Sequence, residues 1–161
     1  MADRNSLLVK LDALYGKMQT LSPTSSSEDL NTFAAFFAED CTAFLKSMRE
    51  QSTPSIGREG VIIGLSDILK DYNILKRRVV SSAVSADGSV VFSEMNNKLN
   101  IHGETLESFP VTAVVAFNGQ GLITSFKHYC CLSPVVEIIQ GKTGVGPYSK
   151  KFLETKVMTT E

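Results

Sequence analysis

The chain has 161 residues, a formal net charge of −1 and an apolar fraction of 43%, a composition typical of one soluble globular domain. This charge gives no sign of the basic surface that binds nucleic acid. No apolar run approaches the roughly 18 residues of a membrane span. Cys41, Cys130 and Cys131 lack metal-ligand spacing and are odd in number, so the sequence predicts no disulfide framework, no metal and a cytoplasmic location.

The first half of the chain reads as three helices and one short strand. Apolar residues at helical spacing over residues 6–21 predict a first helix with Tyr15 on its apolar face. After a serine-rich loop, Ser27 is the expected N-cap of a second helix that stops near Asp40. Residues 41–48 predict a short strand, and residues 58–72 a third helix.

The middle of the chain changes to strand character. Residues 74–85 are rich in β-branched side chains, and Asp87-Gly88 separates them from a second long strand over residues 89–102. The two-residue period of that strand places polar Asn97 on an otherwise apolar face. The run Lys76-Arg77-Arg78 at the start of the first strand is interpreted as a solvated face.

Residues 109–131 predict a long hairpin about the turn at residues 118–121, where Asn-Gly followed by Gly permits a tight connection. On its second arm, His128 alternates with apolar Phe126. A titratable group on an apolar face is the most informative feature of the sequence. The alternate, outer face of the hairpin is too apolar for full exposure, which predicts a homodimer through it. That face comprises Thr112, Val114, Ala116, Tyr129 and Cys131.

The last part of the chain is expected to be less ordered. Residues 135–139 are interpreted as a short edge strand, and the composition after Gly141 turns to Gly, Lys, Thr and Ser. The predicted organisation is one domain over residues 1–140 and a flexible C-terminal tail over residues 141–161.

Three segments carry a family resemblance: FFAEDCTAFL (36–45), SIGREGVIIGL (55–65) and FPVTAVVAFNGQGLITSFKHYCC (109–131). Over about residues 6–133 the chain resembles the nuclear-transport-factor-2-like superfamily, in its SnoaL-like branch of polyketide-cyclase-like and ketosteroid-isomerase-like proteins. The resemblance implies an α+β cone, in which a bent antiparallel sheet wraps over three helices from the N-terminal half. It also implies a pocket that opens at the wide end.

The resemblance assigns side chains to this pocket. Tyr15 matches the tyrosine that the isomerases use, whereas their general-base and protonated aspartates fall at Leu45 and Ala113. Steroid-type isomerisation by that mechanism therefore lacks its base. The acidic residue of cyclase-like members falls at Cys131. The residues that the resemblance points inward, besides Tyr15, Asn97 and His128, are Leu45, Ser93, Met95, Leu99, Val111, Ala113, Val115, Phe126 and Cys130.

Each polar candidate has two interpretations. His128 is a general acid or base, or a core histidine bonded to a neighbour. Tyr15 donates to a ligand oxygen, or packs its ring on the sheet. Asn97 orients a ligand through its amide, or satisfies a strand irregularity. Cys130 is interpreted as a small buried apolar residue and not as a nucleophile, because no base adjacent in sequence would lower the pKa of its thiol.

Two functions follow from these candidates. The first is a cofactor-free isomerase, cyclase or dehydratase acting on a hydrophobic polyketide- or terpenoid-like molecule, with His128 moving a proton while Tyr15 and Asn97 polarise an oxygen. The second is a non-catalytic module of the same fold that holds a small ligand or dimerises.

Overall fold

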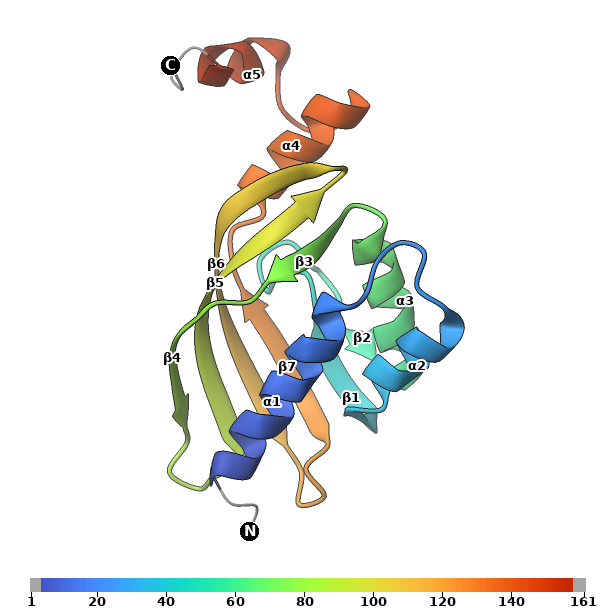
Figure 1. Ribbon diagram of the computed structural model, residues 1–161, viewed down its shortest axis with the longest axis vertical. Helices are drawn as coiled ribbons and strands as arrows, with labels where there is room; N and C mark the ends of the chain where they lie inside the picture. The colour runs from blue at the N-terminus through green and yellow to red at the C-terminus, as the bar shows by residue number, and fades with distance from the viewer. Residues whose placement is uncertain (1–3, 158–161) are drawn as a thin grey trace.

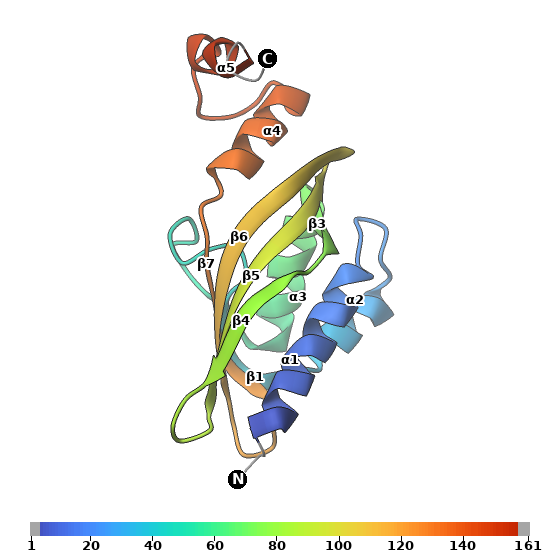
Figure 2. The ribbon, with the colours of Figure 1, turned by 60° about the vertical axis from the view of Figure 1, so that its left-hand side comes forward.

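The structure is a computed structural model that describes residues 4–157, a curved sheet with three helices on its concave side (Figures 1 and 2). The strand order is β2-β1-β7-β6-β5-β3, and β4 pairs with β5 beside β3. The helices α1 (Arg4–Gln19), α2 (Ser27–Ala34) and α3 (Gly57–Leu69) all come from the N-terminal half. The predicted α+β cone is therefore confirmed.

The buried face of α1 and the N-terminus of α2 both have an identifiable physical cause. In α1, Leu7, Leu11, Leu14 and Tyr15 are buried, because their spacing places them on the face that meets the sheet. The N-cap of α2 is Ser26 rather than Ser27, and it forms a capping box with Asp29. The prediction that α2 continues to Asp40 is wrong, since the helix ends at Ala34.

Strand β1 (Phe37–Phe44) occupies the segment assigned in part to the second helix. It pairs in parallel with β7 and antiparallel with the two-residue β2 (Ser55–Ile56). Within it Phe37 and Cys41 are buried while Glu39 and Asp40 are exposed. Pairing with a distant strand therefore overrides the local helical pattern around Phe37.

The edge opposite β1 consists of two short strands instead of the single strand expected over residues 74–85. Strands β3 (Tyr72–Lys76) and β4 (Val79–Val84) pair with successive halves of the twelve-residue β5 (Val90–Ile101). Arg77 and Arg78 lie between the two strands, where the strand structure is interrupted. This interruption matters for the site, because it turns Arg77 toward the interior.

The predicted hairpin is confirmed and is longer than expected. Strand β6 (Glu104–Phe117) pairs antiparallel with β5 and with β7 (Ile123–Tyr129). In the connecting turn the Asn118 side-chain oxygen accepts hydrogen bonds from the backbone of Gln120 and Leu122, at 3.0 Å each. Gly121 takes a positive φ of 73° there, a conformation that favours glycine.

The prediction of an edge strand over residues 135–139 is wrong, because this segment lies in α4 (Ser133–Thr143). Pro134 stands in its first turn, where proline is tolerated, and Val135 is buried. A further helix, α5 (Lys150–Val157), follows, and both project beyond the end of the sheet (Figures 1 and 2). The flexible tail over residues 141–161 stays a prediction, and its residues 158–161 lie outside the described part.

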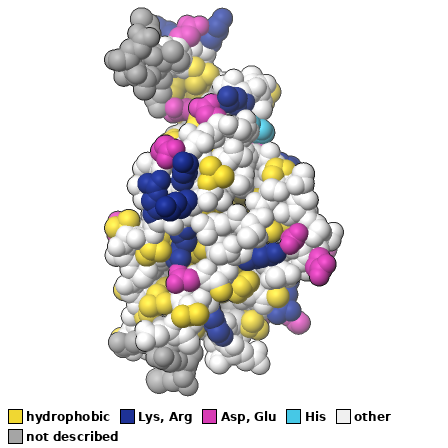
Figure 3. Space-filling view, in the orientation of Figure 1, with side chains coloured by type: hydrophobic (Ala, Val, Ile, Leu, Met, Phe, Trp, Pro, Cys, Tyr) yellow, Lys and Arg dark blue, Asp and Glu magenta, His cyan; other side chains and the backbone are white. Residues whose placement is uncertain are grey.

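The concave side of the sheet holds one hydrophobic core. Phe33, Phe37 and Phe126 pack in a row, with ring centroids 5.5 and 5.9 Å apart, and Tyr15 adjoins Phe126 at 6.4 Å. On the face in Figure 3, basic and acidic side chains are interspersed. Two of the surface ion pairs join Arg78 and Lys98 to Glu107. Over residues 4–157 no helix combines the length and apolarity that a membrane span needs.

Candidate ligand-binding site

A mostly apolar cavity lies where α3 ends and β3 begins, between these elements and the inner face of β5, β6 and β7. Its cavity volume is about 40 Å³, and all the space out to its open mouth is about 540 Å³. The cavity is narrow, so a ligand larger than a few water molecules needs the side chains of the wall to move. The lining residues are Met18, Leu45, Lys46, Leu65, Ile68, Leu69, Tyr72, Asn73, Ile74, Asn97, Leu99, Phe109, Val111 and His128.

His128 joins the cavity wall to two other elements through its imidazole. Its Nδ1 lies 2.8 Å from the carbonyl oxygen of Leu45, which can only accept, so Nδ1 carries the proton. In the neutral ring Nε2 is then an acceptor, and the Tyr15 hydroxyl donates to it across 2.5 Å. The surroundings therefore fix one tautomer of His128.

Both members of this pair are neutral near neutral pH. His128 is 8% exposed, and burial lowers its pKa to about 4, against the raising effect of the Leu45 hydrogen bond. Tyr15 is fully buried, and burial raises its pKa well above the usual value although the Arg77 charge opposes the shift. His128 is thus held in its neutral form, with one proton on Nδ1.

Asn97 lies on the inward face of β5, between Met95 and Leu99. The register of β5 against β6 shifts between Asn97 and Leu99. The side chain is 2% exposed, and its Oδ1 is the one fully buried side-chain nitrogen or oxygen in the described residues without a hydrogen-bond partner. An unsatisfied buried acceptor destabilises the fold, so it calls for a functional explanation.

The other polar groups on the wall have partners or stay neutral. Lys46 pairs with Asp67 of α3 at 3.3 Å, and the Asn73 oxygen accepts from Asn100 at 3.0 Å. Burial raises the pKa of Tyr72, which keeps its hydroxyl neutral. No Asp or Glu occurs among the described residues that line the cavity.

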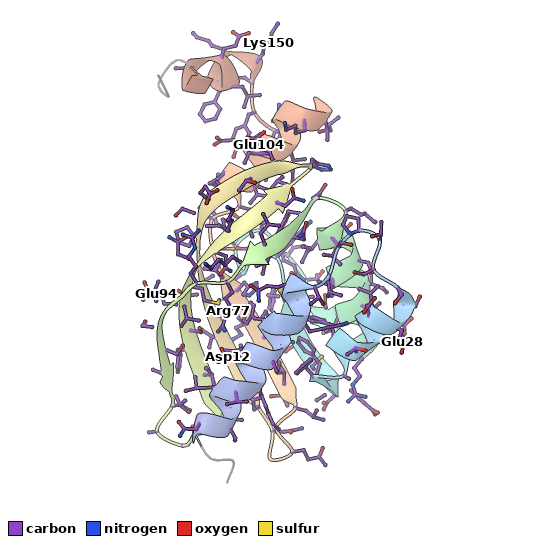
Figure 4. All side chains as sticks on the ribbon, viewed as in Figure 1. Asp12, Glu28, Arg77, Glu94, Glu104 and Lys150 are labelled. Carbon is purple, nitrogen blue, oxygen red and sulfur yellow. The ribbon has the colours of Figure 1, made fainter. Side chains whose placement is uncertain are left out.

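Arg77 lies under α1, so the interpretation of residues 76–78 as a solvated face is wrong for this residue, whereas Lys76 and Arg78 are exposed as expected. Its guanidinium stands 4.5 Å from the centre of the Tyr15 ring and pairs with Asp12 of α1 (Figure 4). It also donates to Ser93 Oγ at 3.3 Å and Met95 Sδ at 3.1 Å. Arg77 therefore fills the space beside Ser93 and Met95, which the resemblance assigned to the pocket.

Because Arg77 and the aromatic row fill the inner end, seven of the twelve expected pocket residues lie away from the cavity wall. Leu45, Leu99 and Val111 line the cavity together with Asn97 and His128, as expected. The residues that are buried but lie deeper in the core are Tyr15, Ser93, Met95, Ala113, Val115 and Phe126. These six residues therefore lie away from the wall of this cavity, although Tyr15 contacts the wall through its hydrogen bond with His128.

Cys130 also lies outside the cavity, past the end of β7. Its thiol contacts the Lys46 carbonyl oxygen at 3.4 Å, and burial raises its pKa to about 11. A thiol with so high a pKa is a poor nucleophile at neutral pH. In residues 4–157 no three His, Cys, Asp or Glu side chains are grouped to hold a metal ion.

Sequence reasoning missed Arg77, Tyr72 and Lys46. The helical spacing of Leu65, Leu69 and Tyr72 marks one face and could have placed Tyr72 at the site. No local pattern signals that Arg77 turns inward, since this depends on the break between β3 and β4.

Solved structures with the same arrangement of elements were found. They include a candidate polyketide cyclase from Xanthomonas campestris pv. campestris, with a TM-score of 0.66 and 20% identity over 81% of this chain and 94% of that chain. The LEH-like epoxide hydrolase of M. tuberculosis gives a TM-score of 0.61 and 16% identity over 88% and 98%. A steroid delta-isomerase from Pseudomonas aeruginosa gives a TM-score of 0.58 and 14% identity, over 98% of this chain and 96% of that chain.

The chain has the nuclear-transport-factor-2-like fold. In sequence no family model and no curated protein matches it. At these identities the likeness concerns the fold, which carries several chemistries, so function must be argued from the site. Within this cone fold, the chain sets His128 and Asn97 on the wall of a cavity whose described lining residues include no carboxylate, and Tyr15 lies behind His128.

The buried state of His128 predicts a dependence of stability on pH. Because its pKa is about 4 in the folded protein and about 6.5 unfolded, the unfolded chain binds more protons between these values. The free energy of unfolding should therefore fall by about 3 kcal/mol on acidification from pH 7 to pH 4 through His128 alone. Urea unfolding of wild type and His128→Gln across this range measures the loss.

The His128→Gln variant keeps every other titrating group, including Asp29, whose pKa is lowered to about 2 and whose contribution is lost only at lower pH. The variant should therefore lack the loss assigned to His128. Parallel stability curves for the two proteins would contradict the buried, neutral state of this imidazole.

Proposed function

We propose that the chain binds a hydrophobic small molecule of the polyketide or terpenoid type in its cavity and converts it, without a cofactor, as an isomerase, cyclase or dehydratase. The observation that carries this proposal is the Tyr15–His128 hydrogen bond of 2.5 Å at the wall of an apolar cavity. Proteins named as a candidate polyketide cyclase, an epoxide hydrolase and a steroid isomerase share the fold, which supports chemistry of this class.

The geometry supports a division of roles between the two residues. Tyr15 lies behind His128 and not on the cavity wall, so a ligand reaches the pair only when the wall opens. Rotation of the Tyr15 hydroxyl toward a ligand oxygen then frees the lone pair of His128 Nε2. A proton can then pass from the ligand to Nε2, while Tyr15 donates to the ligand oxygen on which negative charge develops. The Leu45 carbonyl, 2.8 Å from Nδ1, stabilises the imidazolium that forms. The proton returns to another ligand atom in an isomerisation, or leaves with a hydroxyl group as water in a dehydration.

A non-catalytic module that only binds a small ligand is the second candidate. It is favoured by the saturation of both His128 nitrogens within the protein and by the absence of Asp and Glu from the described cavity wall. In that case the imidazole is a core group that ties α1 to the sheet, and the cavity holds its ligand unchanged.

We also propose that two copies associate through the outer face of the sheet. Phe92 and Tyr129 are 43% and 47% exposed, and pairing places Val114 beside Phe92 and Thr112 beside Tyr129. An apolar face of this kind favours burial, and a self-complementary patch gives a twofold dimer. Free Cys41, Cys130 and Cys131 support a reducing, cytoplasmic location.

The enzyme and binding functions are separated by a ligand screen followed by variants. A thermal-shift screen of polyketide-like phenols, lactones and ketones should give compounds that raise the unfolding midpoint, since they bind only the folded state. If the pair is catalytic, Tyr15→Phe and His128→Gln should lower turnover of a hit by about 10²- to 10⁴-fold while binding persists.

The matched control is Tyr129→Phe, which removes a hydroxyl from an exposed tyrosine on the same sheet and should leave turnover unchanged. A structural role for Tyr15 would instead appear as a loss of about 1–3 kcal/mol in unfolding free energy. A hit that wild type binds but never converts would move the assignment to the binding module.

The dimer is tested by light scattering at micromolar concentration, where wild type should have twice the mass of the 17.5 kDa chain. Phe92→Lys should give the monomer mass, because it places a charge in the proposed interface. Ile63→Lys, at a 64% exposed site on α3, is the matched control and should remain dimeric. A monomeric wild type would refute the dimer.

A further inference from the structure

Asn97 is the polar group on the cavity wall whose bonding the protein leaves incomplete. Its side chain is 2% exposed, and Oδ1 has no hydrogen-bond partner in the described residues. Buried side-chain acceptors are normally bonded, because an unpaired one loses its hydration without compensation. Asn97 lines the cavity although Oδ1 itself is fully buried, so a ligand group that enters as the wall moves is the available partner.

A purely structural role does not explain the amide. Asn97 stands at the point where the register of β5 against β6 shifts, and such irregularities often re-aim a side chain. Its oxygen nevertheless bonds to none of the nearby backbone. The residues on either side on this face, Met95 and Leu99, are apolar and buried, so leucine would satisfy the same position.

The rest of the wall indicates the charge of the group that Asn97 receives. Lys46 is the one side chain that is charged near neutral pH among the described lining residues, and Asp67 holds it at 3.3 Å. His128 is neutral and bonded to Tyr15 and Leu45. Since no unpaired charge faces the cavity, a ligand carboxylate, phosphate or ammonium group would lie there without compensation.

We propose that the cavity selects a neutral apolar alcohol, whose hydroxyl group donates a hydrogen bond to Asn97 Oδ1 while its carbon skeleton fills the apolar wall. This inference rests on the proposed function, because it specifies the ligand of the same cavity. Asn97 is then a specificity residue, which distinguishes a hydroxyl group from a carbonyl or a hydrogen atom at one position of the ligand. A site built to accept a hydrogen bond from a ligand hydroxyl group rejects analogues that lack that hydroxyl.

The test uses three compounds with one carbon skeleton: menthol, menthone and p-menthane. Menthol can donate to Oδ1, whereas menthone can at most accept from Asn97 Nδ2, which leaves Oδ1 unpaired, and p-menthane can do neither. Calorimetric titration of wild type should give an affinity for menthol about 10- to 100-fold higher than for either analogue. In Asn97→Leu, which keeps the side-chain size, this preference should vanish and p-menthane should bind at least as well as it does to wild type.

Stability without ligand supplies an independent readout. Asn97→Leu should raise the unfolding midpoint, because it replaces an unpaired buried amide by an apolar side chain. A lower midpoint would assign Asn97 a structural role and overturn the inference. Equal affinities of wild type for the three compounds would also overturn it while leaving a hydrophobic ligand site intact. Failure of all three to bind would refute both the inference and the proposed ligand site.

Discussion

The site depends on the hydrogen-bonded chain that runs from the Leu45 carbonyl through His128 to the Tyr15 hydroxyl. Its two bonds, 2.8 and 2.5 Å long, join the segment after β1, strand β7 and helix α1, which are far apart in sequence. Because the carbonyl can only accept, the direction of both hydrogen bonds follows from this one contact. The tautomer of His128 and the orientation of Tyr15 are therefore consequences of the backbone position of Leu45.

This chain explains how the protein can bury a histidine without charging it. Burial alone disfavours the imidazolium, and each ring nitrogen has a partner suited to the neutral form. Arg77 contributes a permanent charge nearby, but Asp12 pairs with it and its guanidinium packs on the Tyr15 ring. The interior thus holds a neutral proton acceptor, His128, and a neutral donor, Tyr15. His128 adjoins Leu45 and Ala113, the positions to which the family resemblance assigns carboxylates. Asn97 is left as the polar group that still lacks a partner.

Much of the fold could be predicted because its signals are local. The Asn118–Gly121 turn, the alternation of Val111, Ala113 and Val115, and the spacing in α1 each have a direct physical cause. The two main errors have different causes. Phe37 belongs to a strand because the distant β7 pairs with it. Val135 lies in a helix whose local start signal, Pro134, was overlooked.

The site was predicted less completely than the fold. Alternation correctly placed His128 and Asn97 on the inner face, and the resemblance brought Tyr15 to the same region. The filled inner end of the cone could not be predicted from sequence. Arg77 occupies it only because the strand is interrupted between β3 and β4. This is why Ser93, Met95 and Phe126 are buried in the core and do not line the cavity.

The protonation state of His128 tests the account most directly. Nitrogen-15 NMR of the imidazole at pH 7 distinguishes a protonated from an unprotonated ring nitrogen. The account predicts a neutral ring with the proton on Nδ1 and an unprotonated Nε2 that accepts from Tyr15, and a shift of Nε2 in Tyr15→Phe. An imidazolium, or a neutral ring with its proton on Nε2, would contradict the hydrogen-bonded chain and the chemistry proposed for it.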